Sequence, residues 1–505
     1  MKRITGIASL TSIIFVTLIF SSHAVPSSNF ETREKKNVFF VTLKNQFDLN
    51  HALSKLGQVK ITPLLGGAII EVEVLEGDAH KMIQSLKNHP SIINVVPNFK
   101  MPLKRQEQED EQEIEYIPYE IFPKTDYTWW KKNDGQYHSK VYEFNKKTKK
   151  VKILDDIPSK IGADINLDEA HRIETGNPGV IIAVIDSGID LNHPALANSL
   201  YTNPGEIPGN NTDDDGNGYV DDVNGWNFGT NSGDVSDKIG HGTMVSGVIA
   251  GNGDGFEGVC PECKILPIVL DGFLDGLLNS INYIKKQNVK VINMSLAWDM
   301  RDLPEEDRGT IINLMDTIIK ILSDDGIVIV AAAGNSGHEG NPISYPAYFE
   351  ETIAVGGSDP WDMDAYFSNY GPWVDIVAPA VDIWTTQPLG GIDPHGIPFN
   401  SKTGRSGYNY FSGTSFAAPM VAGAAALLLS HYPHMTASEV KQTLLYRDNT
   451  QLVTDTLALR PPARRLDIGR ALRNPIFSNQ ELLLEVPDMP NEERDEIDPL
   501  ELVWH

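Results

Sequence analysis

Cysteine is scarce in this sequence, since two stand among 505 residues, both in the motif Cys260-Pro261-Glu262-Cys263. This scarcity excludes a small fold held together by many disulfides. A thioredoxin-like redox site lacks its sequence context here, and a zinc site would need a further pair of ligands. Two interpretations remain: one small disulfide, which we favour outside the cytoplasm, or two structural thiols.

Basic residues are also in deficit, with 42 Lys and Arg against 68 Asp and Glu, which gives a net charge of −26. A nucleic-acid partner is therefore not expected, because phosphate binding needs clustered Lys and Arg. Hydrophobic residues make up 41% of the chain. The length exceeds what one hydrophobic core normally covers, so two or more folded units are expected.

Long apolar runs are missing except at the N-terminus, where residues 7–20 follow Lys2 and Arg3 and precede the small residues of Ser22-His23-Ala24. The run is shorter than the ~20 residues of a bilayer-spanning helix. The alternative of a membrane anchor is therefore less favoured than a cleaved signal peptide over residues 1–24. The sequence predicts a secreted or periplasmic protein with no membrane span after cleavage.

Residues 37–101 have the pattern of a small α+β unit. Apolar, β-branched runs alternate with segments of helical spacing, and there is room for one more strand near Ile61. The predicted strands are 38–43, 68–75 and 92–96, and the predicted helices are 49–56 and 78–87.

Two regions have little apolar content. Residues 106–115 are almost all Gln, Glu and Asp, so we predict a solvated linker within an acidic linker and insert over residues 102–156. The insert mixes aromatic residues with lysines and is interpreted as hairpin-like. Residues 475–505 are predicted to be an acidic C-terminal tail.

Between these regions, residues 157–474 alternate buried strands with helices. Continuous apolar runs are predicted as strands over 180–185, 265–270, 289–294, 327–332 and 353–355, with helices over 276–286 and 310–323. Such runs, separated by helices, predict an α/β fold with a parallel sheet covered by helices on both faces.

Two polar residues stand where such a sheet builds its sites. Asp186 ends the first buried strand, in AVIDSGID over residues 183–190. His241 stands between glycines in GHGTMVSG over residues 240–247, which leaves its imidazole room to approach a partner. Alone, an Asp before a Gly turn is common, and a single His is more often structural.

Two further residues complete a set. Ser415 begins a helix of small apolar residues in SGTSFAAPMVAG over 412–423, where free backbone N–H groups stabilise a nearby oxyanion. Asn335 follows a buried strand in AAAGNSG over 331–337, and its amide can donate to the same oxyanion. A simple helix cap explains Ser415 alone, and an ordinary turn explains Asn335 alone.

These four segments, in this order, resemble the signature blocks of the subtilisin-like serine proteases. The resemblance runs from about Ile165 to Arg473 and implies a subtilisin-like catalytic domain over residues 157–474. It implies that Ser415 is the nucleophile, that His241 is the general base and that Asp186 orients His241. It further implies that Asn335 stabilises the oxyanion and that the substrates are proteins or peptides.

The same resemblance places substrate along residues 295–297 as an extended strand, with further contacts at two other positions. The residues it assigns to substrate binding are Ser295, Leu296, Ala297, Gly334 and Ser344. Family members usually have Gly where Ala297 stands, so its methyl group narrows the subsites. Ser344 corresponds to the floor of the primary specificity pocket, and a small polar floor predicts no strong demand for a charged side chain.

The unit of residues 37–101 resembles the family's inhibitory propeptide, by its order of elements and by Val95-Val96-Pro97-Asn98. The resemblance implies a precursor whose own propeptide is an intramolecular inhibitor.

A separate signal lies in DDDGNGYVDDVN, residues 213–224. Read from the first Asp, the ligand positions 1, 3, 5, 7 and 9 of a calcium loop are Asp213, Asp215, Asn217, Tyr219 and Asp221. Gly218 stands at position 6 as in such loops, but Asn224 replaces the bidentate Glu at position 12. Hard oxygen ligands favour structural Ca²⁺, and the alternative is an acidic surface loop.

Three rival functions are weighed against a peptidase. An acid-active relative uses Glu and Asp instead of His, which the His241 segment argues against. A catalytically dead scaffold would not need all four catalytic positions filled. A calcium-dependent adhesion module would leave most of the catalytic segments unexplained.

Overall fold

The structure is a computed structural model. It describes residues 38–43, 59–64, 69–75, 78–87, 89, 92–98, 128–145, 150–270, 272, 274–303, 305–390, 407–453 and 463–478. The predicted signal peptide, the predicted helix 49–56, the acidic run 106–115 and nearly all of the predicted C-terminal tail lie outside the described residues.

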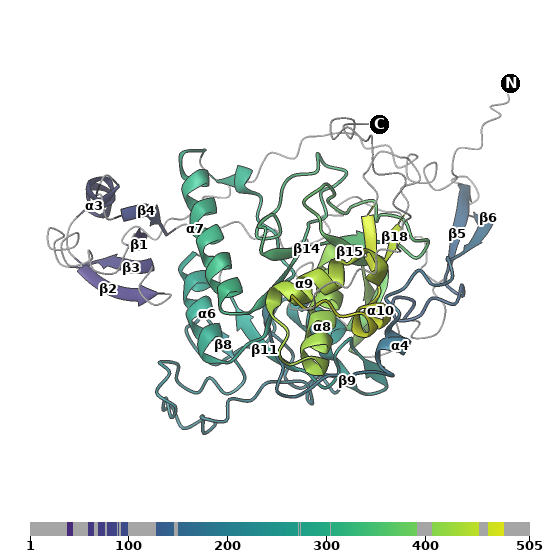
Figure 1. The fold of residues 1–505 in the computed structure, drawn as a ribbon, viewed down its shortest axis with the longest axis horizontal. Helices are drawn as coiled ribbons and strands as arrows, with labels where there is room; N and C mark the ends of the chain where they lie inside the picture. The colour runs from purple at the N-terminus through teal and green to yellow at the C-terminus, as the bar shows by residue number, and fades with distance from the viewer. Residues whose placement is uncertain are drawn as a thin grey trace, which may run out of the picture.

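A sheet of nine strands forms the centre of the molecule, in the order β18-β19-β15-β14-β13-β12-β7-β11-β8 (Figure 1). The pairs from β19 to β8 are parallel, and β18 pairs antiparallel with β19. The strands are β7 (Ile181–Asp186), β8 (Trp226–Asn227), β11 (Lys264–Val269), β12 (Val291–Met294), β13 (Val328–Ala332), β14 (Thr352–Ser358), β15 (Ile376–Pro379), β18 (Thr450–Val453) and β19 (Ala463–Leu466).

Helices cover both faces of this sheet because its strands are apolar on both sides. In β7 every residue is buried, and alternate side chains enter different hydrophobic cores, Ile182 and Val184 one core, Ala183 and Ile185 the other. One face packs against α5 (His241–Ala250), α8 (Thr414–His431), α9 (Ala437–Leu445) and α10 (Ile468–Arg473), and the other against α6 (Leu274–Lys286) and α7 (Glu305–Asp324). The predicted fold class is confirmed.

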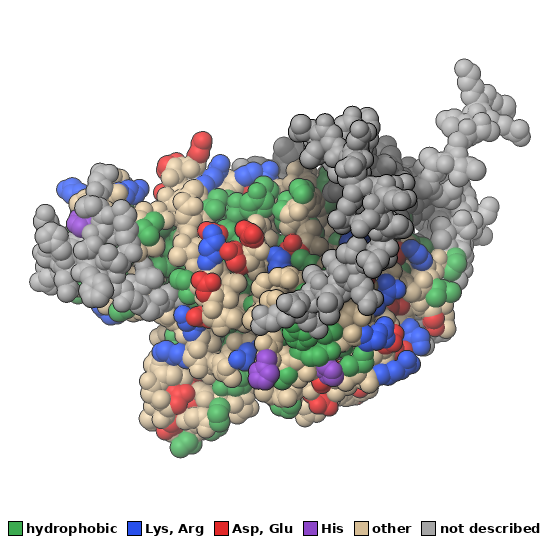
Figure 2. Space-filling model, viewed as in Figure 1, with side chains coloured by type: hydrophobic (Ala, Val, Ile, Leu, Met, Phe, Trp, Pro, Cys, Tyr) green, Lys and Arg blue, Asp and Glu red, His purple; other side chains and the backbone are tan. Residues whose placement is uncertain are grey.

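Helix α8 is long and apolar enough to cross a membrane by composition, as the single such helix among the described residues. Its apolar window is 89% buried inside the protein, which is typical of a central core helix. On the face shown in Figure 2, acidic and basic side chains are mixed rather than separated into large fields.

The N-terminal unit is a separate four-stranded antiparallel sheet of order β2-β3-β1-β4. Its elements are β1 (Val38–Leu43), β2 (Val59–Leu64), β3 (Ile69–Val74), α3 (Ala79–Leu86) and β4 (Ile92–Pro97). Helix α3 covers one face, and its first turn is capped by Asp78, whose side chain accepts from the Lys81 N–H. The other face contacts α6 and α7 of the large unit (Figure 1).

The predicted insert contains a hairpin, β5 (His138–Asn145) paired with β6 (Lys150–Pro158). The segment just before it differs from the prediction. Trp129 and Trp130 are fully buried in the core that contains α5 and α8, next to β16 (Ile383–Thr386). Aromatic side chains ahead of the predicted catalytic domain therefore contribute to its hydrophobic core.

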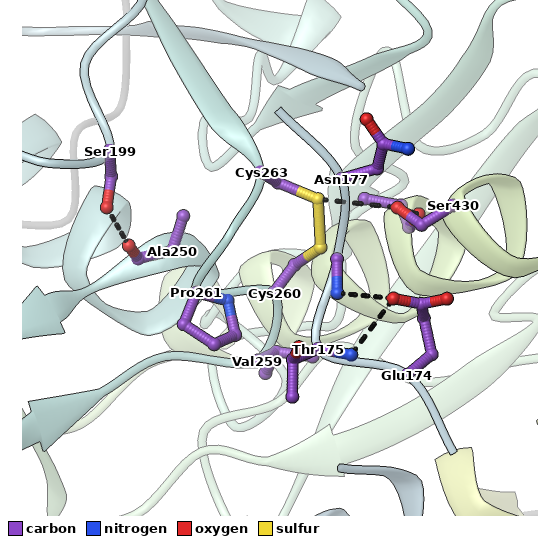
Figure 3. Close-up of a disulfide and its surroundings, with 12 residues drawn as sticks. Glu174, Thr175, Asn177, Ser199, Ala250, Val259, Cys260, Pro261, Cys263 and Ser430 are labelled. Carbon is purple, nitrogen blue, oxygen red and sulfur yellow. Dashed lines mark hydrogen bonds between the residues drawn. A yellow bond between two sulfur atoms is a disulfide. The ribbon is translucent and has the colours of Figure 1, made fainter. Parts of the chain in front are cut away.

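Cys260 and Cys263 form a disulfide and are both buried (Figure 3). Gly176 lies against it, since a Cβ there would stand 2.7 Å from the Cys260 Sγ. The Cys263 Sγ contacts the Ser430 Oγ of α8 at 3.8 Å.

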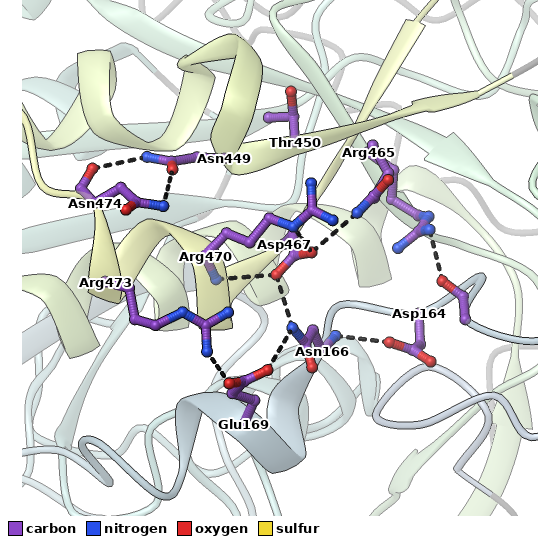
Figure 4. Close-up of polar contacts among 12 residues, drawn as sticks. Asp164, Asn166, Glu169, Asn449, Thr450, Arg465, Asp467, Arg470, Arg473 and Asn474 are labelled. Atoms are coloured by element: carbon purple, nitrogen blue, oxygen red, sulfur yellow. Dashed lines mark hydrogen bonds and ion pairs between the residues drawn. The ribbon is translucent and has the colours of Figure 1, made fainter.

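The remaining elements are short. They are α4 (Leu167–Ala170), β9 (Asn252–Gly253), β10 (Phe256–Glu257), η3 (Met300–Asp302), β17 (Tyr408–Phe411) and η4 (Arg447–Asn449). A polar network joins α4 to the C-terminal elements (Figure 4). In it, the Asn166 amide donates to Asp467 at 3.0 Å, and Glu169 pairs with Arg473.

Candidate active site

Asp186 and His241 meet at the carboxyl end of β7. Asp186 is the last residue of the strand and is 5% exposed, while His241 is the first residue of α5. The His241 Nδ1 lies 2.9 Å from both carboxylate oxygens of Asp186. An imidazole held in this way has its Nδ1 protonated toward the carboxylate, so its Nε2 is the basic nitrogen.

Residues next to His241 in the sequence hold the start of α5 close to the end of β7. Gly242 lies against the β7 turn, because a Cβ there would stand 2.1 Å from the Gly188 carbonyl oxygen. The N-cap residue of α5, Gly240, has no side chain that could cap the helix, and the carboxylate of Asp237 caps it instead. The Asp237 carboxylate accepts from the Gly240 N–H at 2.7 Å and from the Thr243 N–H at 2.9 Å. Sequence reasoning missed Asp237, although an acid four residues ahead of a helical His is a recognisable capping signal.

Ser415 lies in the first turn of α8, after Gly413 at a φ of 149°. It is 9% exposed, and its Oγ lies 3.4 Å from the carbonyl oxygen of Ser295. In return, the Ser295 Oγ donates to the Ser415 carbonyl at 2.8 Å. The first turn of α8 is therefore held against the chain that follows β12.

The Asn335 side chain is oriented by its neighbours. Its Oδ1 accepts from the Thr414 N–H at 2.8 Å and from the Thr414 Oγ1 at 2.7 Å. A backbone N–H only donates, so the bonded atom must be oxygen, and the Nδ2 group remains as a donor. A Cβ at Gly413 would stand 3.0 Å from this Nδ2, which places the amide beside the start of α8.

The residues predicted for substrate lie at the same edge. Residues 295–297 follow β12, and Trp298 then pairs antiparallel with Tyr345 through N···O distances of 2.8 and 3.0 Å. Ser344 is buried, and its Oγ accepts from the Asn369 amide at 3.2 Å. Gly334 lies next to both of these side chains, since a Cβ there would stand 2.7 Å from the Asn369 Nδ2 and 2.8 Å from the Ser344 Oγ. The His241 ring lies 6.0 Å from the ring of Phe416, the residue after Ser415, so the Asp186–His241 pair stands beside the start of α8 and the substrate candidates.

The acidic loop also gathers carboxylates, but in a different set from the predicted one. Carboxylate oxygens of Glu206, Asp213 and Asp215 lie within 4.8 Å of one another. Within the described part of the chain, the Glu206 Oε2 atom is buried without a hydrogen-bond partner. Sequence reasoning missed Glu206, because it stands seven residues ahead of the motif.

Asp221, predicted at position 9 of the loop, is engaged elsewhere. Its backbone adopts a left-handed φ of 53°, and its carboxylate accepts from the N–H groups of Gly209, Asn210 and Asn211. This turn directs it away from the carboxylate cluster. Asn217 stays next to the cluster, with its N–H donating to Asp213 and Asp215 at 3.0 and 2.9 Å. Tyr219 packs its ring against Tyr283 and Trp226.

One carboxyl group of this loop, that of Asp222, lies inside the protein. Asp222 is fully buried, and burial raises the pKa of its carboxyl group. Its oxygens accept from the amides of Asn203 at 2.9 Å, Asn217 at 3.1 Å and Gln287 at 3.1 Å. These bonds fix the base of the loop to α6 and leave Asp213 and Asp215 facing outward.

A carboxylate, an imidazole and a helix-terminal serine, in the order Asp, His, Ser along a mostly parallel sheet, are typical of the subtilisin class of serine peptidases. The model of the subtilase family of peptidases matches residues 177–458, more than half of the chain. The chain therefore belongs to the subtilase family of serine endopeptidases, and the predicted family is confirmed.

Individual relatives share part of their length with this chain. It is similar to the thermophilic serine proteinase of Bacillus sp. (strain AK1), with 35% identity over 271 residues, 52% of this chain and 55% of that protein. It is also similar to the major intracellular serine protease of Bacillus subtilis (strain 168), with 32% identity over 61% of this chain and 82% of that protein.

Among solved structures, the chain resembles fervidolysin of Fervidobacterium pennivorans, described as a keratinolytic enzyme related to subtilisin. The TM-score is 0.55 at 19% identity, over 89% of this chain and 62% of that one. This likeness shows the shared fold.

Proposed function

We propose that this protein is a secreted serine endopeptidase, made as a precursor, that hydrolyses peptide bonds with Asp186, His241 and Ser415. The observation that carries the proposal is the paired contact of the His241 Nδ1 with both oxygens of Asp186 at 2.9 Å. This contact favours the triad over the acid-active alternative, because the base at this position is an imidazole.

Each residue then has one task in the reaction. The Ser415 hydroxyl attacks the substrate carbonyl while His241 takes its proton at Nε2, and His241 later returns that proton to the leaving amine. Asp186 holds the imidazole and stabilises the imidazolium that forms. The Asn335 amide and the Ser415 N–H hold the oxyanion of the tetrahedral intermediate.

Protein or peptide substrates would lie along residues 295–297 as an added strand. The Ala297 methyl narrows this groove compared with a glycine. Ser344 and Gly334 form the floor and wall of the pocket for the side chain before the cleaved bond. Since Ser344 is small and uncharged, we infer a preference for apolar or neutral side chains.

The N-terminal unit, residues 37–101, is proposed to be the inhibitory propeptide. Support comes from its docking, because Phe40, Leu64 and Ile69 share a hydrophobic cluster with α6 and α7. The buried Asn98, directly after β4, accepts from the Asp275 N–H at 3.2 Å, in the first turn of α6. The chain therefore leaves the unit while held against the catalytic domain.

A structural Ca²⁺ ion is proposed at Glu206, Asp213 and Asp215, with Asn217 beside them. The residues fit a hard cation, because three carboxylates converge and the buried Glu206 Oε2 has no other partner among the described residues. The ion would neutralise their mutual repulsion and tie the loop together, with no part in the chemical step. Asp221 is left out of this set because its carboxylate accepts from backbone N–H groups.

The secreted location rests on the N-terminal sequence, residues 1–24, ahead of the described residues. Relatives differ in location, since one is named as an intracellular protease. Fractionation of cells expressing the chain with and without residues 2–24 tests this part. Export that persists without these residues would contradict it.

The test of the central proposal is peptide hydrolysis by Ser415→Ala. We expect kcat to fall by about 10⁶-fold, because the triad acts as a unit. The matched control is Ser430→Ala, at the far end of α8, whose hydroxyl bonds back to the Ala426 carbonyl at 2.8 Å. Equal hydrolysis by wild type and Ser415→Ala, both folded, would overturn the assignment.

A further inference from the structure

The segment 128–137 lies ahead of the residues matched by the family model, yet it is built into the catalytic core. Trp129 and Trp130 have no exposed surface. The Trp129 Nε1–H donates to the Val381 carbonyl at 2.9 Å, and the Trp130 Nε1–H donates to the Trp384 carbonyl at 3.3 Å. The indoles therefore lie against β16 and against Val381, two positions before the strand, with their polar atoms satisfied.

The rest of the segment is anchored by buried polar contacts. The Asn133 N–H donates to Asp164 at 2.7 Å, and its amide donates to the Pro360 carbonyl at 3.1 Å. The Asn133 Oδ1 accepts from the Ser159 hydroxyl at 2.7 Å. Asp164 also accepts from the Asn166 N–H, so the segment is continuous with the network in Figure 4. A surface linker would not bury an asparagine whose side chain bonds on both sides.

Strand β16 also lies directly on the helix that begins with His241. The Thr385 and Thr386 hydroxyls donate to the carbonyls of Met244 and Thr243 at 2.8 and 2.7 Å. Gly247 permits this contact, because a Cβ there would stand 2.1 Å from the Thr386 Oγ1. The order of contacts is thus segment 128–137, then β16, then α5 and its first residue, His241.

We propose that residues 128–137 remain in the mature enzyme as a positioning element that holds β16 and α5, and with them His241, in catalytic geometry. The proposal rests on the proposed precursor function and places the maturation cut N-terminal to Trp129. A cut after Tyr137 would release two buried indoles and leave the Val381 and Trp384 carbonyls without these donors.

The first test is the N-terminus of the processed, active enzyme, read by intact mass and N-terminal sequencing. We expect it at or before Thr128. A fully active enzyme that begins after Trp129 would overturn the proposal. Failure of the proposed function itself would look different, because the wild type would then show neither hydrolysis nor labelling at Ser415.

The second test is Trp130→Ala, assayed as kcat per titrated active site. We expect kcat to fall by roughly 10-fold to 100-fold with KM little changed, because small displacements of catalytic groups have effects of that size. Trp130→Phe, which keeps a buried ring, should regain most of the loss. The control is Lys132→Ala in the same segment, whose exposed side chain pairs with Asp168.

A Trp130→Ala enzyme that melts earlier but keeps the wild-type kcat per titrated site would contradict a positioning role. Should Trp130→Ala fail to fold, Trp130→Leu takes its place in the same assay. A kcat per titrated site that falls in Trp130→Leu and recovers in Trp130→Phe then supports the proposal, and a wild-type kcat in Trp130→Leu overturns it.

Discussion

The two largest sheets among the described residues bury their faces in different ways. The central sheet is covered on both faces by helices of its own unit. The N-terminal sheet has one face covered by α3, while the other face lies on α6 and α7. A sheet face that packs only against a second unit is suited to docking, which is what an inhibitory propeptide needs.

The largest effect is expected when the N-terminal unit and the catalytic unit are separated and then mixed. We expect residues 25–101, added at micromolar concentration to mature enzyme, to suppress most peptide cleavage, because the docking face is complementary to α6 and α7. Mature enzyme without the unit should stay active. Fully active protein that retains an intact N-terminal unit would instead make that unit a permanent domain.

Changing the docking face sharpens the comparison. Phe40→Asp should weaken inhibition by about 10-fold to 100-fold, because burying a Phe side chain contributes about 1.5–3 kcal/mol. The matched control is Ile93→Asp, since Ile93 is 56% exposed in the same unit. Inhibition constants measured with both variants decide, and equal weakening by the two would contradict the assigned face.

Calcium is expected to raise the thermal stability of the catalytic unit and not that of the N-terminal unit. At a concentration 100 times the Kd, bound Ca²⁺ contributes about 2.7 kcal/mol, which is roughly 4 °C in the Tm of a domain of this size. Chelator should remove this increment from wild type but not from Glu206→Gln. Asp214→Asn, an equal charge change outside the cluster, is the control. A chelator effect that survives Glu206→Gln would place the ion elsewhere.

The smallest expected effect is a pH dependence of docking. Burial at the interface, and then the nearby charge of Asp275, raise the pKa of Glu71 above its ordinary value. The docked state therefore binds the proton more tightly than the free unit. Inhibition should be strongest below the ordinary pKa of Glu71 and weaken as pH rises through the raised value.

Glu71→Gln tests this sign, because it removes the titration. Its inhibition constant should change less with pH than that of wild type, by a few-fold across this window. Glu73→Gln, on the same strand and paired with Lys60 at 3.5 Å, is the control. Inhibition by wild type that strengthens with rising pH would show that another group dominates.

The sequence predicted most of the fold because its strongest patterns are local. The continuous apolar runs became the parallel strands, and the β1 strand has the predicted bounds, Val38–Leu43. The candidate catalytic residues were found because each follows a strand or begins a helix within a characteristic segment. Bringing them together needs only the rule that parallel strands share a carboxyl edge.

The contacts that local patterns did not predict are created by the folding of the chain. Trp129 and Trp130 show no periodicity of their own, and the Val381 and Trp384 carbonyls that they bond are about 250 residues away. Glu206 joins the carboxylate cluster only because the loop folds back on it. The Asp221 carboxylate accepts from backbone N–H groups earlier in the same loop, a contact that the spacing of calcium ligands does not reveal.

Covalent labelling by a serine-reactive phosphonylating reagent tests the catalytic assignment most directly. The mature enzyme should incorporate one label per molecule at Ser415, mapped by peptide mass, and lose peptidase activity in parallel. His241→Ala should label far more slowly, because the hydroxyl loses its base, while Ser430→Ala should label like wild type. Active enzyme that takes up no label, or takes it up at a different residue, would contradict the account.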